Sequence, residues 1–359
     1  MTNTIFVTGG AGFIGSSIIR EALGRGHKVV NLDALTYAGG EDNLSDIADH
    51  DDYIFIQGTI VDNALVAGIF KDHTPDTIIN VAAETHVDRS IDDAAAFIET
   101  NINGTYNLLD QSYRYISSID GDVANRFRYL QVSTDEIYGS IRNGAFVETD
   151  PYRPNSPYAA SKASADHLVR AYFKTYGLAT VITHGSNTYG PRQFPEKLIP
   201  LMIQNALEGK ALPIYGDGKN VRDWLYVTDH ANGILDAARN GVPGESYNIG
   251  GGVELENITL VNQIIDILDQ LSPPSDGGSY RDLITYVADR PGHDFRYALD
   301  ISKATAALSW QPVESFNSGL KQTIDWYLEN QDWTARRRKN VHDGSRQGLG
   351  NNTDREDQS

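Results

Sequence analysis

Short apolar runs alternate with amphipathic segments through the first half of the chain. Runs rich in β-branched residues predict buried strands, and segments with apolar residues at a 3.6-residue spacing predict helices. The predicted strands are Ile5–Val7, Val29–Leu32, Tyr53–Ile56, Thr77–Val81 and Arg128–Val132. The predicted helices are Phe13–Leu23, Ala64–Lys71, Ala94–Ser112 and Ser156–Tyr176. This order predicts an α/β fold, a doubly wound parallel sheet covered by helices on both faces.

The pattern becomes less regular after Asn187 and predicts a smaller α/β lobe that binds the substrate at the carboxyl edge of the sheet. Its predicted elements are a helix at Lys197–Glu208, strands near Leu212–Tyr215 and Tyr247–Ile249, and a helix at Leu260–Leu271. We expect a dinucleotide-binding domain at residues 1–186, interleaved with a lobe at 187–334, and a disordered polar tail at 335–359. The alternative for the basic cluster Arg336–Lys339 is an interaction tag, but its composition favours a solvated tail.

Composition narrows the possible functions of these 359 residues. The formal net charge is −18, which argues against nucleic acid as a partner because nucleic-acid binders present a basic surface. The acid excess fits either high-salt solubility or an ordinary acidic surface. Without cysteine the chain has no disulfide or thiolate nucleophile, and we predict no metal because its nine histidines show no ligand spacing. With no signal peptide or long apolar run, we expect no membrane association and a cytoplasmic location.

A glycine-rich segment directly follows the first predicted strand. Gly10, Gly12 and Gly15 fit the dinucleotide fingerprint, in which missing side chains permit a tight turn and close approach of a pyrophosphate to a helix N-terminus. Asp33 ends the second strand at the separation expected for a residue that binds ribose hydroxyls, and its charge would repel a 2′-phosphate. The segment therefore predicts a Rossmann-type site for NAD rather than NADP.

A second motif agrees with this interpretation. Tyr158 and Lys162 lie four residues apart, on one face of a predicted helix, so the ammonium group can lower the pKa of the phenol. Together with the GxxGxxG spacing of Gly9, Gly12 and Gly15, this pair resembles the extended short-chain dehydrogenase/reductase family. The resemblance implies that Thr134, after the fifth strand, supplies a third catalytic hydroxyl.

Two adjacent carboxylates, Asp135 and Glu136, follow Thr134 where the strand opens into the expected crevice. Different environments can split the pKa values of such a pair into one proton donor and one proton acceptor, which an elimination requires. The structural alternative is a helix N-terminus stabilised by acids.

Longer segments narrow the resemblance to nucleotide-sugar 4,6-dehydratases, and specifically to the dTDP-glucose 4,6-dehydratase family. They are Asp33–Gly39, Ala82–Ile91, Gln193–Pro200, Arg222–Val227 and Asp289–Asp294, within a similarity that covers roughly residues 4–330. The resemblance implies that the sugar is oxidised at carbon 4, loses water across carbons 5 and 6, and is reduced at carbon 6 through bound NAD. Tyr158 is then the base at the 4-hydroxyl, Glu136 the base at carbon 5 and Asp135 the acid at the 6-hydroxyl, while Thr134 and Lys162 polarise the reacting groups.

Binding residues follow from the same resemblance, position by position. The cofactor set is Gly9, Gly12, Phe13, Ile14, Gly15, Asp33, Ala34, Leu35, Thr36, Thr59, Ile60, Ala82, Ala83, Thr100, Tyr158, Lys162 and Thr188. The substrate set is Thr85, Thr134, Asn187, Lys197, Leu198, Pro213, Tyr215, Arg222, Asn248, Arg290 and His293. The two arginines suit a diphosphate because a guanidinium group offers two parallel donors.

The chain departs from the family pattern at Thr59, Thr188, His184 and Gly40-Glu41-Asp42, which bears on base preference and NAD retention. A 4-epimerase or decarboxylase would share the fold and Tyr158 but needs no carboxylate pair, and a dehydratase for CDP-, UDP- or GDP-sugars remains open. A non-catalytic NAD-binding module would have a degraded catalytic set. The resemblance also implies a homodimer formed through the helices around Ala94–Ser112 and Ser156–Tyr176.

Overall fold

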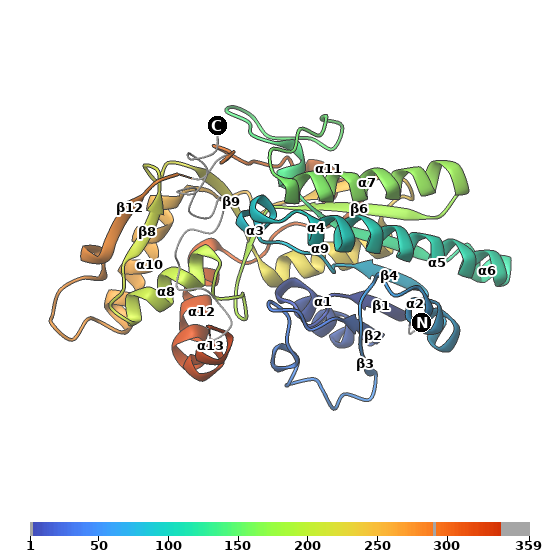
Figure 1. Ribbon diagram of the computed structural model, residues 1–359, viewed down its shortest axis with the longest axis horizontal. Helices are drawn as coiled ribbons and strands as arrows, with labels where there is room; N and C mark the ends of the chain where they lie inside the picture. The colour runs from blue at the N-terminus through green and yellow to red at the C-terminus, as the bar shows by residue number, and fades with distance from the viewer. Residues whose placement is uncertain (1–2, 290–291, 339–359) are drawn as a thin grey trace, which may run out of the picture.

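The computed structural model describes residues 3–289 and 292–338, and its centre is a parallel sheet of seven strands (Figure 1). Every neighbouring pair in this sheet is parallel. In spatial order the strands are β10 (Ser246–Ile249), β6 (Thr180–Gly185), β5 (Arg128–Thr134), β4 (Thr77–Asn80), β1 (Thr4–Thr8), β2 (Lys28–Asp33) and β3 (Tyr53–Gln57). The strand order reverses between β1 and β4, which is where doubly wound sheets bind their ligands.

Helices cover both faces of this sheet. On one face lie α1 (Phe13–Gly24), α9 (Val227–Asn240) and α11 (Ser302–Leu308). On the other lie α2 (Asn63–His73), α5 (Thr105–Ser118) and α7 (Pro157–Tyr176). The side chains between each helical layer and the sheet form a separate apolar core, with Ile18, Ile234 and Trp310 in the first and Phe70, Leu108 and Val169 in the second. Burial of both faces explains why most of these strands are rich in apolar residues.

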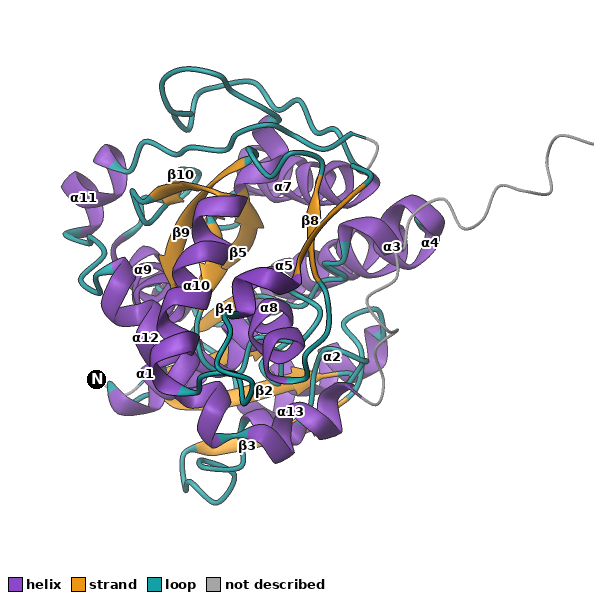
Figure 2. Ribbon diagram, turned by 90° about the vertical axis from the view of Figure 1, so that its left-hand side faces the viewer, coloured by secondary structure: helices purple, strands orange, loops and turns teal. Residues whose placement is uncertain are grey.

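The smaller lobe lies at one end of the sheet, at the left of Figure 1 and in front in Figure 2. It contains a two-stranded sheet of β8 (Leu212–Tyr215) and β12 (Ile284–Val287), and a three-stranded sheet of β7 (Asn187–Tyr189), β9 (Val221–Tyr226) and β11 (Glu254–Glu256). Its helices are α8 (Leu198–Leu207), α10 (Asn257–Leu271), α12 (Phe316–Glu329) and α13 (Gln331–Arg338). These helices pack around a third apolar core that contains Met202, Ile264, Ile324 and Trp333.

Short helices complete the described chain. They are η1 (Glu41–Asn43), α3 (Val87–Asp92), α4 (Ala95–Phe97), α6 (Gly121–Ala124), η3 (Asp135–Tyr138) and η4 (Tyr280–Leu283), together with a π-helical turn, η2 (Ile98–Gly104), between α4 and α5. No helix in the described ranges is long and apolar enough to cross a bilayer.

The predicted fold class is confirmed, whereas several predicted elements need correction. The predicted helix Ala94–Ser112 is interrupted by the π-helical turn, where Asn101 bonds the backbone of Glu84 and the hydroxyl of Ser161. The interleaving is extensive, because β10 and α9 belong to the main sheet and its helical layer although they follow residue 186. Helix α13 extends to Arg338, so the expectation of disorder from Ala335 is wrong for the first four residues of the tail; the rest lies outside the described residues.

Candidate active site

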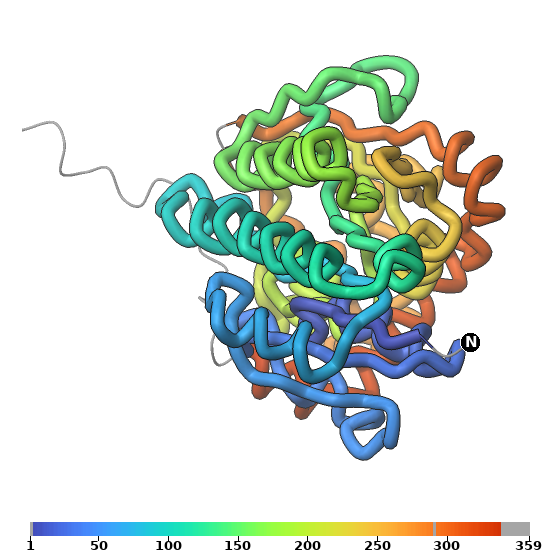
Figure 3. The backbone as a smooth tube through the Cα atoms, turned by 90° about the vertical axis from the view of Figure 1, so that its right-hand side faces the viewer, coloured from blue at the N-terminus to red at the C-terminus, as the bar shows by residue number. Residues whose placement is uncertain are grey.

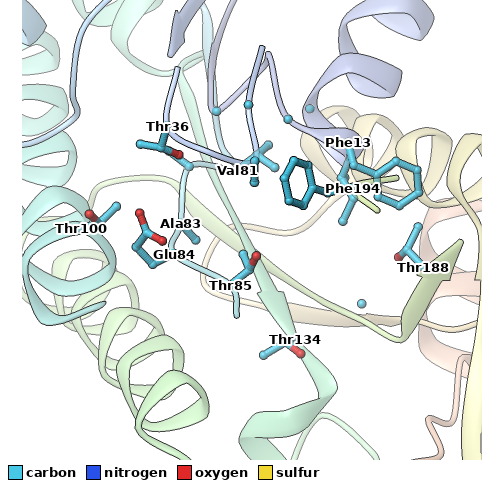
Figure 4. A pocket seen from close by; sticks show the side chains of 18 of the residues that line it. Phe13, Thr36, Val81, Ala83, Glu84, Thr85, Thr100, Thr134, Thr188 and Phe194 are labelled. Carbon is cyan, nitrogen blue, oxygen red and sulfur yellow. The ribbon is translucent and has the colours of Figure 1, made fainter. Parts of the chain in front are cut away.

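A cleft of about 360 Å³ runs along the carboxyl ends of the central strands and is closed on one side by the smaller lobe. Its walls come from the segments after β1, β2, β3, β4, β5 and β6, and the smaller lobe adds Gln193, Phe194 and Lys197. Figure 4 shows Thr36 and Thr134 on opposite sides of this space, with Ala83 and Thr85 between them. A single space therefore connects the glycine turn with the carboxylate pair.

The glycine turn lies at one end of the cleft, and its close packing excludes side chains. Gly9 has a φ of 70°, and a Cβ there would lie 2.7 Å from the backbone of Ala82. A Cβ on Gly15 would lie 2.2 Å from the carbonyl oxygen of Gly9. Gly12 precedes α1, and no side chain caps this helix N-terminus. Uncapped N–H groups beside such a turn suit a pyrophosphate, so these residues fit a dinucleotide.

Asp33 closes the same end of the cleft and is 8% exposed. Its carboxylate accepts hydrogen bonds from the backbone N–H groups of Ala11 and Leu35, each at 2.8 Å. Burial raises the pKa of Asp33, and the two backbone donors and the positive charge of Arg337 act against that rise. The carboxylate is thus fixed at the mouth of the glycine turn, as expected for a ribose-binding residue.

Most predicted cofactor residues line this cleft. They are Gly9, Gly12, Phe13, Ile14, Gly15, Asp33, Ala34, Thr36, Thr59, Ile60, Ala82, Ala83, Thr100, Tyr158 and Thr188. The two that do not are Leu35, whose side chain packs against the first core, and Lys162. The position of Leu35 therefore does not support a contact between its side chain and a cofactor.

The predicted catalytic residues meet where β5 ends. Thr134 accepts a hydrogen bond from the backbone N–H of Glu136 at 3.3 Å and so caps η3, and its hydroxyl lies 3.3 Å from the Asp135 carboxylate. Tyr158 lies in the first turn of α7, which Ser156 caps, and it also lines the cleft. The structural alternative considered for the carboxylate pair, acids at a helix N-terminus, is therefore present in the fold.

Asp135 and Glu136 occupy different environments. Asp135 is 2% exposed, and its pKa is raised well above the ordinary value, first because of burial and then because of the carboxylates of Glu136 and Asp223; nearby Arg222 opposes this rise. Glu136 is half-buried and lines the cleft. A carboxyl group whose burial favours its protonated form, next to a more accessible carboxyl group, is the arrangement that acid and base catalysis of an elimination requires.

The expectation that Lys162 lowers the pKa of Tyr158 is not met in the protein alone. Burial raises the pKa of Tyr158, the nearby Glu136 and Asp135 raise it further, and a hydrogen bond with Thr134 only partly opposes them. The ammonium group of Lys162 instead donates to the carbonyl oxygen of Val132 at 2.7 Å, and burial lowers the pKa of this lysine to about 8. The sequence spacing places both groups on one helix but cannot reveal how deeply they are buried.

The predicted substrate residues lie in different parts of the structure. Thr85, Thr134, Asn187 and Lys197 line the cleft. Pro213 and Tyr215 lie on β8. The Tyr215 ring packs edge-on against the His293 ring, with centroids 6.4 Å apart. The Nδ1 of His293 lies 2.6 Å from the Asp289 carboxylate. The guanidinium group of Arg222 is buried, donates to the carbonyl oxygens of Val221, Asp294 and Phe295, and lies 4.4 Å above the Tyr297 ring.

Pro213, Tyr215, Arg222 and His293 are not among the residues that line the cleft, and neither are Asn248 and Leu198. Asn248 is fully buried, and its side chain contacts Tyr138, His184 and the carbonyl oxygen of Phe146. Leu198 begins α8 and packs against the core of the smaller lobe. Arg290 lies outside the described residues.

Twelve of the residues that line the cleft were not predicted as site residues, among them Glu84, Gln193, Phe194 and His230. Glu84, Gln193 and Phe194 lie within segments that carried the family resemblance, so their proximity to motif residues was a usable signal. His230 lies on α9, which the sequence pattern did not predict. Its Nδ1 lies 2.7 Å from the Thr188 hydroxyl, and burial lowers its pKa to about 4, so the ring is neutral at physiological pH.

The described ranges contain no group of three His, Asp or Glu side chains arranged to hold a metal ion.

Comparisons with known proteins agree with this geometry. The family model for GDP-mannose 4,6 dehydratase matches residues 6–323. The chain is 53% identical over 340 residues to dTDP-glucose 4,6-dehydratase 1 of Escherichia coli, covering 92% of this chain and 94% of that protein. The structure of a dTDP-glucose 4,6-dehydratase from Streptomyces venezuelae with NAD bound is similar with a TM-score of 0.85 at 44% identity, over 93% of this chain and 99% of that one. A UDP-glucose 4-epimerase of Thermus thermophilus gives a TM-score of 0.79 at 30% identity, over 91% and 99%.

Proposed function

Since this chain belongs to the GDP-mannose 4,6-dehydratase family and, within it, to the dTDP-glucose 4,6-dehydratases, we propose that it converts dTDP-glucose to dTDP-4-keto-6-deoxyglucose and water. The chain is an NAD-dependent hydro-lyase, so its reaction involves no net oxidation. The observation that carries the proposal is the buried Asp135 beside the more accessible Glu136, in one cleft with Thr134 and Tyr158. Epimerisation needs no such pair, whereas elimination of water needs both groups.

The first step is removal of the proton from the sugar 4-hydroxyl by Tyr158. The Thr134 hydroxyl hydrogen-bonds the phenol and orients it. Lys162 keeps its ammonium form below pH about 8. In the protein alone this group donates to the carbonyl oxygen of Val132, so its proposed role is to polarise the reacting groups once NAD and the sugar are bound. NAD, when bound, supplies a two-electron acceptor for carbon 4 that is restored when carbon 6 is reduced.

The second step is elimination across carbons 5 and 6. A ketone at carbon 4 makes the proton at carbon 5 acidic, and Glu136 takes that proton. Asp135, whose raised pKa favours its protonated form, gives its proton to the 6-hydroxyl, and the bond between carbon 6 and oxygen breaks to release water. After reduction at carbon 6, Glu136 returns a proton to carbon 5. The two carboxyl groups therefore have opposite roles because their burial differs.

The nucleotide end of the substrate lies toward the smaller lobe in this proposal. Lys197 reaches across the cleft to the carbonyl oxygen of Thr85 at 3.3 Å, so it connects the two lobes where a sugar diphosphate would enter. Tyr215 and His293 provide an aromatic surface further along the same lobe. The guanidinium group of Arg222, which would bind the diphosphate, donates to three backbone carbonyl oxygens in the protein alone.

We further propose a homodimer formed through α5 and α7, which pack side by side on the surface turned toward the viewer in Figure 3. Tyr106 on α5 and Tyr176 at the end of α7 are 52% and 50% exposed, and Ile98 just before α5 is 50% exposed. Exposed large apolar side chains gathered along one helix pair suit a subunit interface. A cytoplasmic location stays a prediction from the sequence.

The test is to incubate the purified protein with dTDP-glucose and, separately, with UDP-, CDP- and GDP-glucose, and to follow loss of water from the sugar by mass spectrometry. Each reaction is run with and without added NAD, so that a cofactor lost during purification is distinguished from an inactive site. We expect the dehydrated product chiefly from dTDP-glucose. Dehydration of another nucleotide sugar alone would contradict the substrate, and epimerisation without loss of water would contradict the reaction.

A further inference from the structure

The C-terminal helix α13 is held firmly on the smaller lobe. Trp333 is 6% exposed and packs edge-on against Trp326, with ring centroids 4.9 Å apart. Arg338 donates to Glu208, at the end of α8, at 2.5 Å and to Asn205 at 3.1 Å. These contacts hold α13 in place, and they therefore fix the direction in which the side chain of the neighbouring residue Arg337 extends.

Arg337 crosses from this helix to the loop after β2, residues 34–43, called here the β2 loop. Its side chain is 10% exposed, one Nη donates to the carbonyl oxygen of Gly39 at 2.6 Å, and the other forms an ion pair with Asp42. Its guanidinium group also lies 5.5 Å from the centroid of the Trp333 ring. The guanidinium group packs directly against Gly40, where a Cβ would lie 2.1 Å from its Nη2.

The β2 loop is part of the cofactor end of the cleft. Ala34, Thr36, Ala38 and Gly39 line the cleft. The backbone N–H of Gly40 and the side chain of Asn43 both donate to the carbonyl oxygen of Ala11 in the glycine turn, at 3.1 and 2.8 Å. Direct contacts therefore connect Arg337 with the β2 loop, and the β2 loop with the glycine turn.

We propose that Arg337 is a positioning residue for NAD: it fastens the β2 loop against the glycine turn and so slows release of the cofactor. The loop carries an aspartate at position 42, and this carboxylate is the ion-pair partner of Arg337. The positive charge of Arg337 also favours the ionised form of Asp33. This inference rests on NAD as the cofactor of the proposed function, and it concerns retention of NAD rather than the chemistry of the sugar.

The test measures how fast bound NAD exchanges with isotopically labelled NAD in protein loaded with NAD, without any sugar present. We expect Arg337→Gln to exchange roughly ten-fold faster than the wild type, because hydrogen bonds to a charged group are lost. Arg337→Lys keeps the charge but cannot make both contacts, so it falls between the two. Hydrogen exchange of backbone amides in residues 34–43 should also accelerate in Arg337→Gln.

The matched control is Arg336→Gln, since Arg336 is 59% exposed and its nearest carboxylate oxygen, on Asp42, lies at 3.9 Å. This control should exchange NAD at the wild-type rate. If Arg337→Gln does not fold, Asp42→Asn removes the ion pair without touching α13 and should exchange NAD several-fold faster. Wild-type exchange rates in folded Arg337→Gln or Asp42→Asn, or equal acceleration in Arg336→Gln, would overturn the inference. Because the assay contains no sugar, failure of the dehydratase proposal would appear separately, as absence of water loss at saturating NAD.

Discussion

The two ends of the cleft are built in different ways. The catalytic end takes Thr134, Asp135 and Glu136 from one strand end and Tyr158 and Lys162 from one helix, all close together in the sequence. The cofactor end depends on the β2 loop, which is held by Arg337 from 295 residues away along the chain. The groups proposed for the chemistry are therefore positioned locally at the end of one strand and on one helix, whereas the loop at the cofactor end is held by contacts from both lobes.

This difference suggests that rate and cofactor retention can be changed separately. Asp135 and its neighbours are on regular elements, where small displacements are resisted by packing on both faces of the sheet. The β2 loop is irregular between Ala34 and Gly40, so its position depends on a few specific contacts. Changes at the catalytic end should therefore affect turnover, and changes at α13 should affect NAD exchange.

The largest expected effect is that of Glu136→Gln. Loss of the base at carbon 5 should reduce turnover of dTDP-glucose by about 10²–10⁴-fold while the content of bound NAD stays at the wild-type level. Turnover is measured by mass spectrometry of the product and NAD by absorbance after protein denaturation. A variant that keeps wild-type turnover would remove Glu136 from the mechanism, and one that loses NAD would couple the two ends of the cleft.

A pH profile gives the next largest effect. The pKa of Lys162 is lowered to about 8, so its ammonium form predominates below that pH and disappears above it. If the ammonium form is required, turnover at saturating NAD and sugar falls about ten-fold per pH unit above about pH 8. In Lys162→Arg the charge persists across this range, so whatever activity remains should not fall there. A flat wild-type profile up to pH 10 contradicts this role.

If the two ends of the cleft are independent, substitutions at the two ends should have nearly additive effects on NAD exchange. In the double variant Glu136→Gln/Arg337→Gln, NAD should exchange at the rate of Arg337→Gln alone, within about two-fold, because sites without shared partners couple by at most about 0.5 kcal/mol. The measurement is the labelled-NAD exchange described above. A markedly slower or faster exchange in the double variant would show that the carboxylate pair and the β2 loop act as one unit.

The smallest effect concerns stability and tests the environment of Asp135. Its pKa is raised in the folded protein, so the fold loses stability as the pH rises from about 4, where Asp ionises in the unfolded chain, through that raised value. Asp135→Asn cannot ionise in either state, so it avoids the cost of protonating this carboxyl group on folding and should raise the melting temperature at pH 7 by about 2–4 °C. At pH 4 the difference should vanish. A lower melting temperature for the variant at pH 7 would indicate that the Asp135 carboxyl group stabilises the fold.

Local motifs predicted the parts of the molecule that are contiguous in the sequence. The glycine turn, Asp33 and the Tyr158–Lys162 pair were found because their spacing follows from a strand, a turn or one helix face. Helix α9 was not predicted because Asp229, His230 and Gly233 occupy buried positions and interrupt its apolar periodicity. Strand β6 was missed in the same way, since it carries His184 in its buried interior.

Long-range packing explains what the sequence could not predict. Gln331–Arg338 is too polar to indicate a packed helix, yet Trp333 is buried in the core of the smaller lobe and Arg337 contacts the β2 loop, which lies far away in the chain. Asn248 was assigned to the substrate by position, but its side chain is enclosed by Tyr138 and His184. Whether such a residue packs in the fold or lines the site depends on its burial and on its partners far away in the chain. Neither can be derived from the spacing of residues in the sequence.

The central claim is that Glu136 and Asp135 eliminate water across carbons 5 and 6. The most direct measurement is the reaction of the wild type with dTDP-glucose in D₂O, followed by mass spectrometry and proton NMR of the sugar. We predict a product that has lost one water and carries solvent deuterium at carbon 5, and neither change in Glu136→Gln. A product of unchanged mass inverted at carbon 4, or a dehydrated product without deuterium at carbon 5, would contradict the account.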